Sequence, residues 1–354
     1  MIKIAIDGMG GDFAPQVTVA GAVEAANSFD DIEVIIVGRE DAIKRELYKH
    51  KVVGGKISIK HASDMIEMSD SPVQSIKKKK DSSLSVAIDL IKQKEAQAVV
   101  TAGNTGAAVA ASTLQLGLLP GIKRPGIAIM LPTPHGISIA IDVGANINPT
   151  SEHLLQYAIM ANIYARYLLK KKQPSIGLLN IGEEESKGTE LQKETYKLLR
   201  DSNLNFIGNI EGRDFFTGKV DCIVCDGFVG NVTLKLTESL LEMMISLISK
   251  EISKNWLAKI GAILCKSAFD SIRKDTNYEE AGGAPLLGVN GIVIISHGIS
   301  SARAISNAIR VARDAVVERI NDHIIDGITE YSKMHLESAT NSSTQQHPTP
   351  RVIS

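Results

Sequence analysis

Short apolar runs alternate with amphipathic stretches along most of the chain. The runs are rich in Ile, Val, Leu and Ala and carry few charges, which is typical of strands buried on both faces of a mostly parallel sheet. The stretches between them favour helices, so the alternation predicts an α/β fold whose sheet is sandwiched by helices. The predicted strands are Ile2–Asp7, Glu33–Val37, Lys56–Ile59, Ala98–Thr101, Ile127–Leu131, Ile137–Val143, Ser175–Ile181, Asn205–Ile210, Asp221–Asp226 and Gly291–Ser296.

Two regions break this alternation. Between residues 240 and 272 apolar residues recur at helical spacing on both sides of Asn255, which predicts a helical hairpin over about residues 232–274. From Tyr331 to Ser354 the chain is dominated by Ser, Thr, Gln, Asn and Pro, a composition that predicts a disordered tail. We therefore expect one large α/β catalytic domain over residues 1–330, followed by this tail.

Composition narrows the class of protein. The 354 residues are 44% hydrophobic, enough to bury a large core, and 39 basic against 40 acidic side chains provide no overall field for nucleic acid. No apolar run is long enough for a signal peptide or a membrane span, so we expect a cytoplasmic protein. Cys222 and Cys225 should face opposite sides of a strand, where they can neither pair nor share a metal. We expect no metal and no cofactor.

Four predicted strands end in a glycine-rich turn that carries an amide, hydroxyl or imidazole. The turns lie at 101–106, 142–146, 225–231 and 296–298. Glycine lets backbone N–H groups approach an anion, and a following helix adds roughly half a positive charge. Any single turn is equally explained as a tight connection, but in an open sheet the carboxyl ends of parallel strands meet at one crevice. We therefore expect the four turns to lie together.

Two nucleotide-binding motifs are approached but not met. Phe13 stands where the third glycine of a dinucleotide fingerprint belongs, and no acidic ribose ligand follows the second strand. The segment Gly182–Thr189 resembles a P-loop with its last Gly and Lys transposed, and its three glutamates would repel a polyphosphate. Nicotinamide and nucleotide triphosphates are therefore poor candidates for the ligand.

Six ordered motifs between about residues 1 and 325 closely resemble the bacterial phosphate acyltransferase of phospholipid synthesis, the PlsX family. They are Asp7–Asp12 with Pro15, Thr101–Ala107, Asp142–Asn146, Asn180–Glu184 with Lys187 and Gly188, Cys225–Phe228 with Gly230–Val232, and Gly282–Gly288 with His297 and Gly298. The clearest departure is Ser239, where members often carry glycine. The resemblance implies transfer of a fatty acyl group from acyl carrier protein to inorganic phosphate. It also implies a homodimer with a fold like phosphotransacetylase and isopropylmalate dehydrogenase.

The residues of these motifs suit that chemistry. Phosphate is already ionised near neutral pH and a thiol leaves readily, so the protein must mainly orient two substrates and stabilise an oxyanion. We expect catalytic roles for Lys187, Asn231 and His297, and substrate binding by Asp7, Gly10, Gly11, Gly103, Asn104, Thr105, Gly106, Asn146, Asp226 and Gly230. Phosphate is assigned to the turn Gly103–Gly106, with Lys187, the one cation embedded in these motifs, as a further candidate ligand.

Each of these residues also has a structural interpretation. For Asn104, Asn146 and Asn231, helix capping and ligand binding are about equally favoured. Lys187 could pair with a neighbouring glutamate, and His297 could be a hydrogen-bonded core histidine. Asp7 and Asp12 could orient the first glycine turn or bind Mg²⁺, and we favour the orienting role.

The expected partners follow from charge and apolar patterning. Acidic acyl carrier protein should dock on basic surface, either at Lys77–Lys80 or at the lysines of the hairpin, Lys254, Lys259 and Lys266 with Arg273 and Lys274. The second hairpin helix has the composition of an interfacial helix, which predicts contact with an anionic membrane through Trp256, Leu257, Ile260 and Leu264. The first should pack in the homodimer.

A peripheral position at the inner face of the cell membrane would suit delivery of acyl phosphate to a membrane-bound glycerol-phosphate acyltransferase. Two alternatives stay open: a phosphotransacylase of the same fold that uses coenzyme A, and a non-catalytic membrane scaffold.

Overall fold

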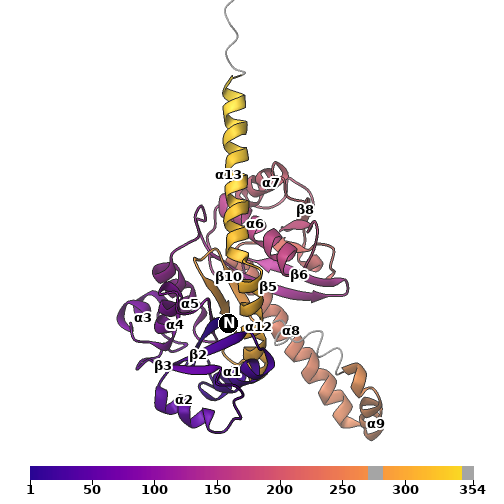
Figure 1. Ribbon diagram of the computed structural model, residues 1–354. Helices are drawn as coiled ribbons and strands as arrows, with labels where there is room; N and C mark the ends of the chain where they lie inside the picture. The colour runs from indigo at the N-terminus through magenta and orange to yellow at the C-terminus, as the bar shows by residue number, and fades with distance from the viewer. Residues whose placement is uncertain (270–281, 345–354) are drawn as a thin grey trace, which may run out of the picture.

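The computed structural model describes residues 1–269 and 282–344, whose strands form one eleven-stranded sheet covered by helices (Figure 1). The strand order is β3-β2-β1-β4-β11-β10-β5-β6-β9-β7-β8. The strands are β1 (Ile2–Asp7), β2 (Ile32–Gly38), β3 (Ile57–His61), β4 (Ala98–Thr101), β5 (Gly126–Thr133), β6 (Gly136–Ile141), β7 (Ile176–Leu179), β8 (Phe206–Ile210), β9 (Cys222–Val224), β10 (Ala284–Leu287) and β11 (Ile292–Ile295). All ten predicted strands are confirmed, with ends shifted by no more than two residues.

The sheet consists of two parallel blocks that run in opposite directions. In the first block β3, β2, β1, β4 and β11 are parallel, and in the second β6, β9, β7 and β8 are parallel. Between the blocks β10 is antiparallel to β11 and to β5, and β5 is antiparallel to β6. The direction is therefore reversed three times between β11 and β6, so that the second block points opposite to the first.

Strand β10 is missing from the sequence prediction. It is only four residues long, contains Pro285, and lies between Gly283 and Gly288, which have φ of +82° and +92°. Glycine and proline at this spacing indicate a loop when the sequence is read alone. The pairing becomes visible only when β11 and β5 lie on either side of it.

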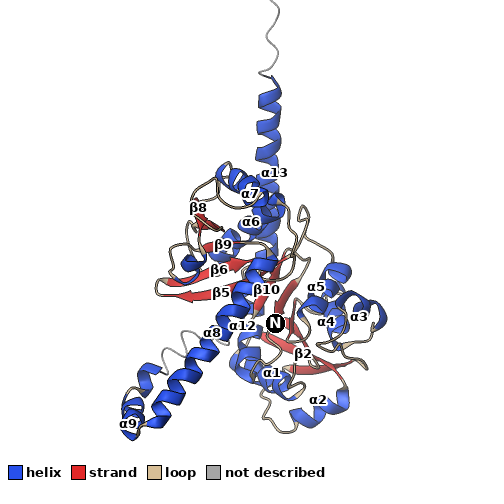
Figure 2. Ribbon diagram, turned by 180° about the vertical axis from the view of Figure 1, so that it is seen from behind, coloured by secondary structure: helices blue, strands red, loops and turns tan. Residues whose placement is uncertain are grey.

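Helices cover both faces of the sheet (Figure 2). Ile305 and Ile309 of α12 pack with α1 against one face of the first block, whereas α4 and α5 cover the other face. In the second block Tyr157 and Tyr164 of α6 are fully buried together with Ile324 of α13. The elements that form these layers are α1 (Gln16–Ser28), α2 (Glu40–Leu47), α3 (Pro72–Lys78), α4 (Ser83–Lys92), α5 (Thr105–Ala111), η1 (Ser112–Leu116), α6 (Ser151–Tyr167), α7 (Glu190–Arg200), η2 (Gly212–Phe216), α12 (Ala302–Val317) and α13 (Ile320–Thr344).

A helical hairpin projects from the body of the molecule, as predicted (Figures 1 and 2). It consists of α8 (Gly227–Lys254) and α9 (Trp256–Leu264). Between them Asn255 leaves the helical conformation, and its side chain caps α9 by accepting a 2.9 Å hydrogen bond from the Leu257 N–H. Only Gly227 and Gly230 of the hairpin are buried, and most of its large apolar side chains are exposed in the protomer. Residues 270–274 of the predicted hairpin, with Arg273 and Lys274, lie outside the described residues.

The C-terminal region differs from the disordered tail that the sequence predicts from Tyr331. Helix α13 continues to Thr344, beyond the part that is anchored in the core by Ile324 and Ile328. An anchored helix propagates cheaply because each added residue gains a hydrogen bond without a new nucleation step. Residues 345–354 lie outside the described residues. None of the described helices combines the length and apolarity needed to cross a bilayer.

Candidate functional site

The structure separates the four glycine turns into two groups, which corrects the expectation that they share one crevice. The turns after β1, β4 and β11 leave the carboxyl end of the first block, and those after β6, β9 and β7 leave the carboxyl end of the second. Because the blocks run in opposite directions, the carboxyl ends of their strands point to opposite sides. We call the carboxyl end of the first block the first edge and that of the second block the second edge. The first edge carries Asp7, Gly10, Gly11, Gly103–Gly106 and His297, and the second carries Asn146, Lys187, Asp226, Gly230 and Asn231.

At the first edge, the buried carboxylate of Asp7 organises the turns. It accepts hydrogen bonds from the hydroxyls of Ser83 (2.6 Å) and Thr101 (2.8 Å), and the Thr101 hydroxyl oxygen accepts one from the Gly103 N–H (3.0 Å). Burial raises the pKa of Asp7, against the lowering effect of these hydrogen bonds. A Cβ at position 10 would lie 2.4 Å from the carboxylate, so a residue larger than glycine does not fit there. The hydrogen bonds of Asp7 therefore join β1 to α4 and to the turn after β4, as the predicted orienting role requires.

Asn104 is a helix cap rather than a free ligand. Its Oδ1 accepts a hydrogen bond from the Ala107 N–H (3.0 Å), and its Nδ2 donates to the carbonyls of Met68 (2.9 Å) and Asp70 (3.2 Å). The side chain thus fastens the loop of residues 67–70 to the start of α5. A Cβ at Gly106 would lie 2.7 Å from Pro72, the first residue of α3, so the start of α3 covers part of the proposed phosphate cradle. Thr105 beside it is exposed.

His297 is exposed, in contrast to the core histidine that was the alternative interpretation. Its Nδ1 accepts a weak, 3.4 Å hydrogen bond from the Ile299 N–H. His297 therefore lies at the first edge, accessible from solvent and held in its turn by this hydrogen bond.

At the second edge, Asp142 has a structural role that the sequence analysis missed. Its fully buried carboxylate accepts four backbone hydrogen bonds of 2.7–3.0 Å, from Ile127, Gly144, Ala145 and Asn146. Burial raises its pKa, whereas these hydrogen bonds lower it. The amides of this turn therefore donate to the Asp142 carboxylate and do not point at a site for a bound anion. An aspartate just after a strand and before Gly-Ala-Asn is the signal that could have revealed this.

Asn146 and Asn231 cap no helix, but both hold turns together. Asn146 donates from Nδ2 to the Tyr157 hydroxyl (3.3 Å), and its carbonyl accepts the Gly227 N–H (3.0 Å). Asn231 donates from Nδ2 to the Val143 carbonyl (3.0 Å). The turn after β6 is thereby fixed against the start of α8. The N-cap of α8 is Asp226, whose carboxylate accepts a hydrogen bond from the Val229 N–H (2.8 Å). Gly230 is closely packed, because a Cβ there would lie 2.0 Å from the Asp142 carbonyl oxygen.

Lys187 is an exposed cation in the loop after β7. Its neighbour Glu183 is paired with Lys219 (2.7 Å) and lies 4.0 Å from Arg213, and Glu185 is paired with Arg200 (3.0 Å). In the part of the chain that the structure describes, Lys187 forms no ion pair, so the predicted alternative, pairing with a glutamate, is not found. The Nδ2 of Asn180 donates to the Lys187 carbonyl (3.1 Å) and so holds the loop beside β7.

Comparison with known proteins identifies the family. The model of a family described as "Fatty acid synthesis protein" matches residues 2–323. A phosphate acyltransferase of Geotalea uraniireducens is 46% identical over 336 residues, which cover 95% of this chain and 97% of the relative. One of Syntrophotalea carbinolica is 47% identical over 324 residues, or 92% and 93% of the two chains. The chain belongs to the phosphate acyltransferase family.

Solved structures agree with this family at the level of the fold. A phosphotransacetylase from Streptococcus pyogenes aligns with a TM-score of 0.60 at 18% identity, over 90% of this chain and 94% of that one. A branched-chain phosphotransacylase from Enterococcus faecalis aligns with a TM-score of 0.55 at 16% identity, over 89% and 99%. The predicted phosphotransacetylase-like fold is confirmed.

A phosphate acyltransferase needs no protein thiol as nucleophile, and the thiols of the second block are unsuited to be one. Cys222 and Cys225 are unpaired and buried, and burial raises the pKa of both thiols. The Cys225 thiol donates to the Asp142 carbonyl (3.2 Å), which points it into the protein. Neither thiol is therefore a candidate nucleophile.

Proposed function

We propose that this protein transfers a fatty acyl group from the thioester of acyl carrier protein to inorganic phosphate, releasing the carrier thiol and acyl phosphate. The proposal extends the family assignment to a specific donor. It further assigns the reaction to the second edge, where Lys187 and the N-terminal end of α8 lie. The observation that carries this assignment is Lys187 itself, an exposed lysine with no carboxylate partner among the described residues, whereas Arg200, Arg213 and Lys219 of the neighbouring segments are paired.

Charge explains the choice of the second edge. Phosphate is a dianion or monoanion near neutral pH, so its binding requires positive charge that is not already neutralised. At the first edge the buried group is the carboxylate of Asp7, and the side chain of Asn104 is committed to capping. The second edge also holds a buried carboxylate, Asp142, and the Asp226 carboxylate already caps α8. The difference in charge between the edges therefore lies in Lys187, which forms no ion pair among the described residues.

The mechanism needs little acid or base catalysis. Lys187 would hold phosphate with one oxygen directed at the thioester carbon, and that oxygen forms the new bond while the carbon–sulfur bond breaks. The carrier leaves as a thiolate, because a thiol of pKa about 8.5 is a good leaving group. Asn231, in the second turn of α8, has its Nδ2 engaged by Val143. We therefore assign it to positioning of the turn after β6, within which Asn146 is also fixed.

One incubation tests this function against its alternatives. Purified protein is mixed with palmitoyl carrier protein and phosphate, and acyl phosphate and free carrier thiol are measured. We expect both products, with rates that depend on phosphate. Equal or faster release from palmitoyl-coenzyme A would favour a coenzyme A-dependent phosphotransacylase, and the absence of phosphate-dependent thioester loss would favour a scaffold.

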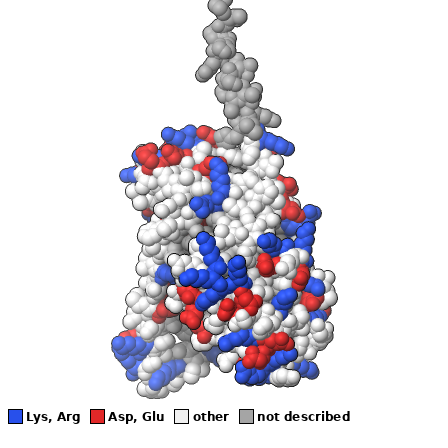
Figure 3. Space-filling view, turned by 90° about the vertical axis from the view of Figure 1, so that its left-hand side faces the viewer, with Lys and Arg blue, Asp and Glu red and all other residues white. Residues whose placement is uncertain are grey.

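Docking of the acidic carrier is proposed at the basic end of α3. Figure 3 views the side of the molecule on which α3 lies, and Lys and Arg side chains gather near the middle of this face. The last turn of α3 carries Lys77 and Lys78, whereas Lys79 is paired with Asp70 (2.6 Å). The first two lysines are therefore the better candidates for contact with the carrier. Because α3 adjoins the turn after β4 at the first edge, the docking surface and the assignment of phosphate to Lys187 are separate proposals with separate tests.

Carrier docking of this kind predicts a salt-dependent reaction. Raising the ionic strength should increase KM for acyl carrier protein several-fold, because exposed charges are screened beyond about 8–10 Å. Lys77→Glu with Lys78→Glu should cause a similar increase at low salt. An acyl pantetheine donor, which lacks the carrier, serves as the control and should respond to neither change. A carrier KM that is constant with salt would contradict the proposal.

We further propose that the protein acts as a homodimer at the inner face of the membrane, next to the membrane-bound acyltransferase that would consume its product. The apolar residues of α8 and α9 are exposed in the protomer, among them Leu236, Leu240 and Leu247 of α8. An apolar surface of this extent favours burial against another surface. The dimer would cover α8, and the membrane would receive α9.

Membrane contact through α9 makes a prediction of its own. Trp256, Leu257, Ile260 and Leu264 are all exposed on this helix, and burial of such side chains in the interface favours binding. Leu257→Glu or Ile260→Glu should reduce the fraction bound to vesicles of anionic lipid in a flotation assay at least several-fold. Activity on soluble substrate should be retained, and Leu114→Glu, at another exposed apolar position, is the control. Unchanged flotation of both α9 variants would leave dimer packing as the better explanation of the surface.

A further inference from the structure

Each segment that leaves the carboxyl end of a strand of the second block exposes a large apolar side chain. Ile147 follows β6, Phe228 follows β9, Ile181 follows β7 and Phe216 ends η2, which follows β8. Their exposed fractions are 61%, 61%, 83% and 41%. Large apolar side chains exposed on successive loops are unusual for a surface that faces only water. We refer to these four residues as the apolar row.

The row follows the order of the strands. β6 pairs with β9, β9 with β7, and β7 with β8, and Ile141, Val224 and Leu178 are partners in register near the strand ends. Four neighbouring strands at about 4.8 Å spacing span about 14 Å. The row therefore offers an elongated apolar surface along one edge of the sheet. The hydrogen bond from the Gly227 N–H to the Asn146 carbonyl (3.0 Å) joins the segments that carry its first two members.

We propose that the apolar row binds the acyl chain of the thioester donor. The inference rests on the proposed function, because it names the place of the chain relative to Lys187. Lys187 belongs to the same loop as Ile181, six residues later, and Phe228 lies in the first turn of α8. A thioester held between this lysine and this helix would have its chain beside the row, and the base of the exposed apolar helix α8 continues the surface.

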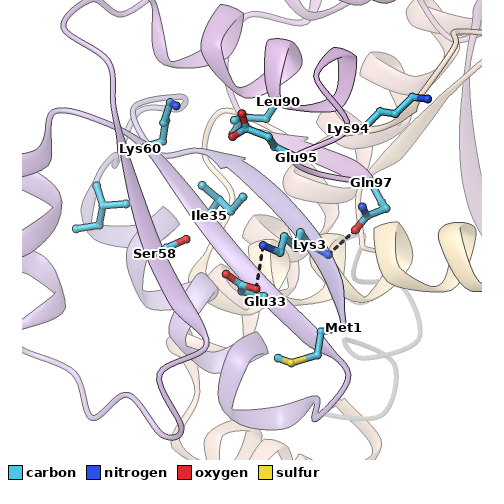
Figure 4. Close-up of a pocket in the computed structure, with 11 residues that line it drawn as sticks. Met1, Lys3, Glu33, Ile35, Ser58, Lys60, Leu90, Lys94, Glu95 and Gln97 are labelled. Carbon is cyan, nitrogen blue, oxygen red and sulfur yellow. Dashed lines mark hydrogen bonds and ion pairs between the residues drawn. The ribbon is translucent and has the colours of Figure 1, made fainter.

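Two cavities stand out among the described residues, and neither suits an acyl chain. The first, about 390 Å³, lies beside β1, β2 and β3, and none of the residues that line it belongs to the glycine turns (Figure 4). Lys3 and Glu33 form an ion pair across it (3.5 Å), and Lys60, Lys94 and Glu95 also line it. The second, about 10 Å³ beside Tyr164, is too small. A long apolar chain is therefore better accommodated on an exposed apolar surface than in either cavity.

The first edge also exposes apolar side chains, which makes it the rival location. Phe13 follows β1 and Met68 lies in the loop fastened by Asn104, with 55% and 49% of each side chain exposed. We favour the second edge because three of the four residues of its row are more exposed than any apolar residue of the first edge. The row is also adjacent to Lys187, which forms no ion pair among the described residues. The rival is included in the test.

The test compares two donors on the same carrier. kcat/KM is measured for palmitoyl and for butyryl carrier protein, without vesicles, and the ratio of the two values is reported, so that carrier docking, phosphate binding and the active fraction cancel. Ile181→Ser and Phe228→Ser should each lower this ratio roughly tenfold, the size expected when one large apolar contact is lost. Ile181→Leu should preserve the ratio. Val53→Ser, at a 54% exposed position between α2 and β3, should also preserve it.

The outcomes separate this inference from the proposed function. If the wild-type protein forms acyl phosphate from neither donor, the proposed function fails and the inference fails with it. If both donors react but the ratio is unchanged in the Ile181→Ser and Phe228→Ser variants, only the inference is overturned. A fall of the ratio in Phe13→Ser and not in the row variants would move the chain to the first edge. Light scattering on each variant identifies any loss of ratio that is caused by a changed oligomeric state, and such a result would also overturn the inference.

Discussion

Asp142→Ala should lower the free energy of unfolding by about 4 kcal/mol. The carboxylate is fully buried and accepts four backbone hydrogen bonds, and each buried N–H left without an acceptor costs about 1–3 kcal/mol. Because the turn can relax in part after the substitution, the expected loss of stability is smaller than the cost of four N–H groups left without an acceptor. Acyl transfer should fall as well, because this turn is fastened to the start of α8. Urea unfolding followed by circular dichroism measures the first effect.

Two further variants sharpen this test. Asp142→Asn keeps one oxygen acceptor of similar shape and should lose about half as much stability. Asp41→Ala removes a carboxylate whose only ion-pair partner among the described residues is Arg45, on the surface of α2, and should change stability by less than about 0.5 kcal/mol. If Asp142→Ala were as mild as Asp41→Ala, the four hydrogen bonds would not be what maintains the turn.

Lys187→Met should lower kcat/KM for phosphate about 100-fold, with the free energy of unfolding nearly unchanged. The lysine is exposed and forms no ion pair in the described residues, so its removal costs little stability. Loss of a charged group that holds an anion at a reaction centre is worth about 10²–10³ in rate. Phosphate saturation curves at fixed acyl carrier protein measure this effect. Lys197→Met, which changes an exposed lysine of α7, is the matched control and should be neutral.

Asn104→Ala distinguishes the two candidate phosphate sites. Because Asn104 caps α5 and fastens the loop of residues 67–70, its loss should cost about 1–2 kcal/mol of stability and leave KM for phosphate unchanged. A large rise of that KM in Asn104→Ala, together with normal kinetics in Lys187→Met, would return phosphate to the turn Gly103–Gly106. Unchanged phosphate kinetics in both variants would exclude both locations.

Periodicity alone predicted most of the fold, because the signals for strands and helices are local. A buried strand needs only a short run of branched apolar residues, so β1, β4 and β9 are recognisable without any neighbour. The break at Asn255 is equally local, since an asparagine at the start of a new helix caps it. Local signals also explain what the prediction missed. Strand β10 forms only because β11 and β5 lie on either side of it, and the later part of α13 is helical because it extends from a segment anchored in the core.

The candidate site was predicted as a set of residues but not as an arrangement. The sequence by itself determined which loops carry glycine, amides and Lys187, and these motifs determined the family. Only the tertiary structure decided that the motifs belong to two edges, because strand direction depends on the pairing of β10, β5 and β6, which no local pattern reveals. It also decided that Asn104 caps a helix and that Asp142 consumes the amides of its turn. A hydrogen-bonding side chain satisfies whichever partner the fold brings within reach, and that partner is determined by packing between segments distant in the chain.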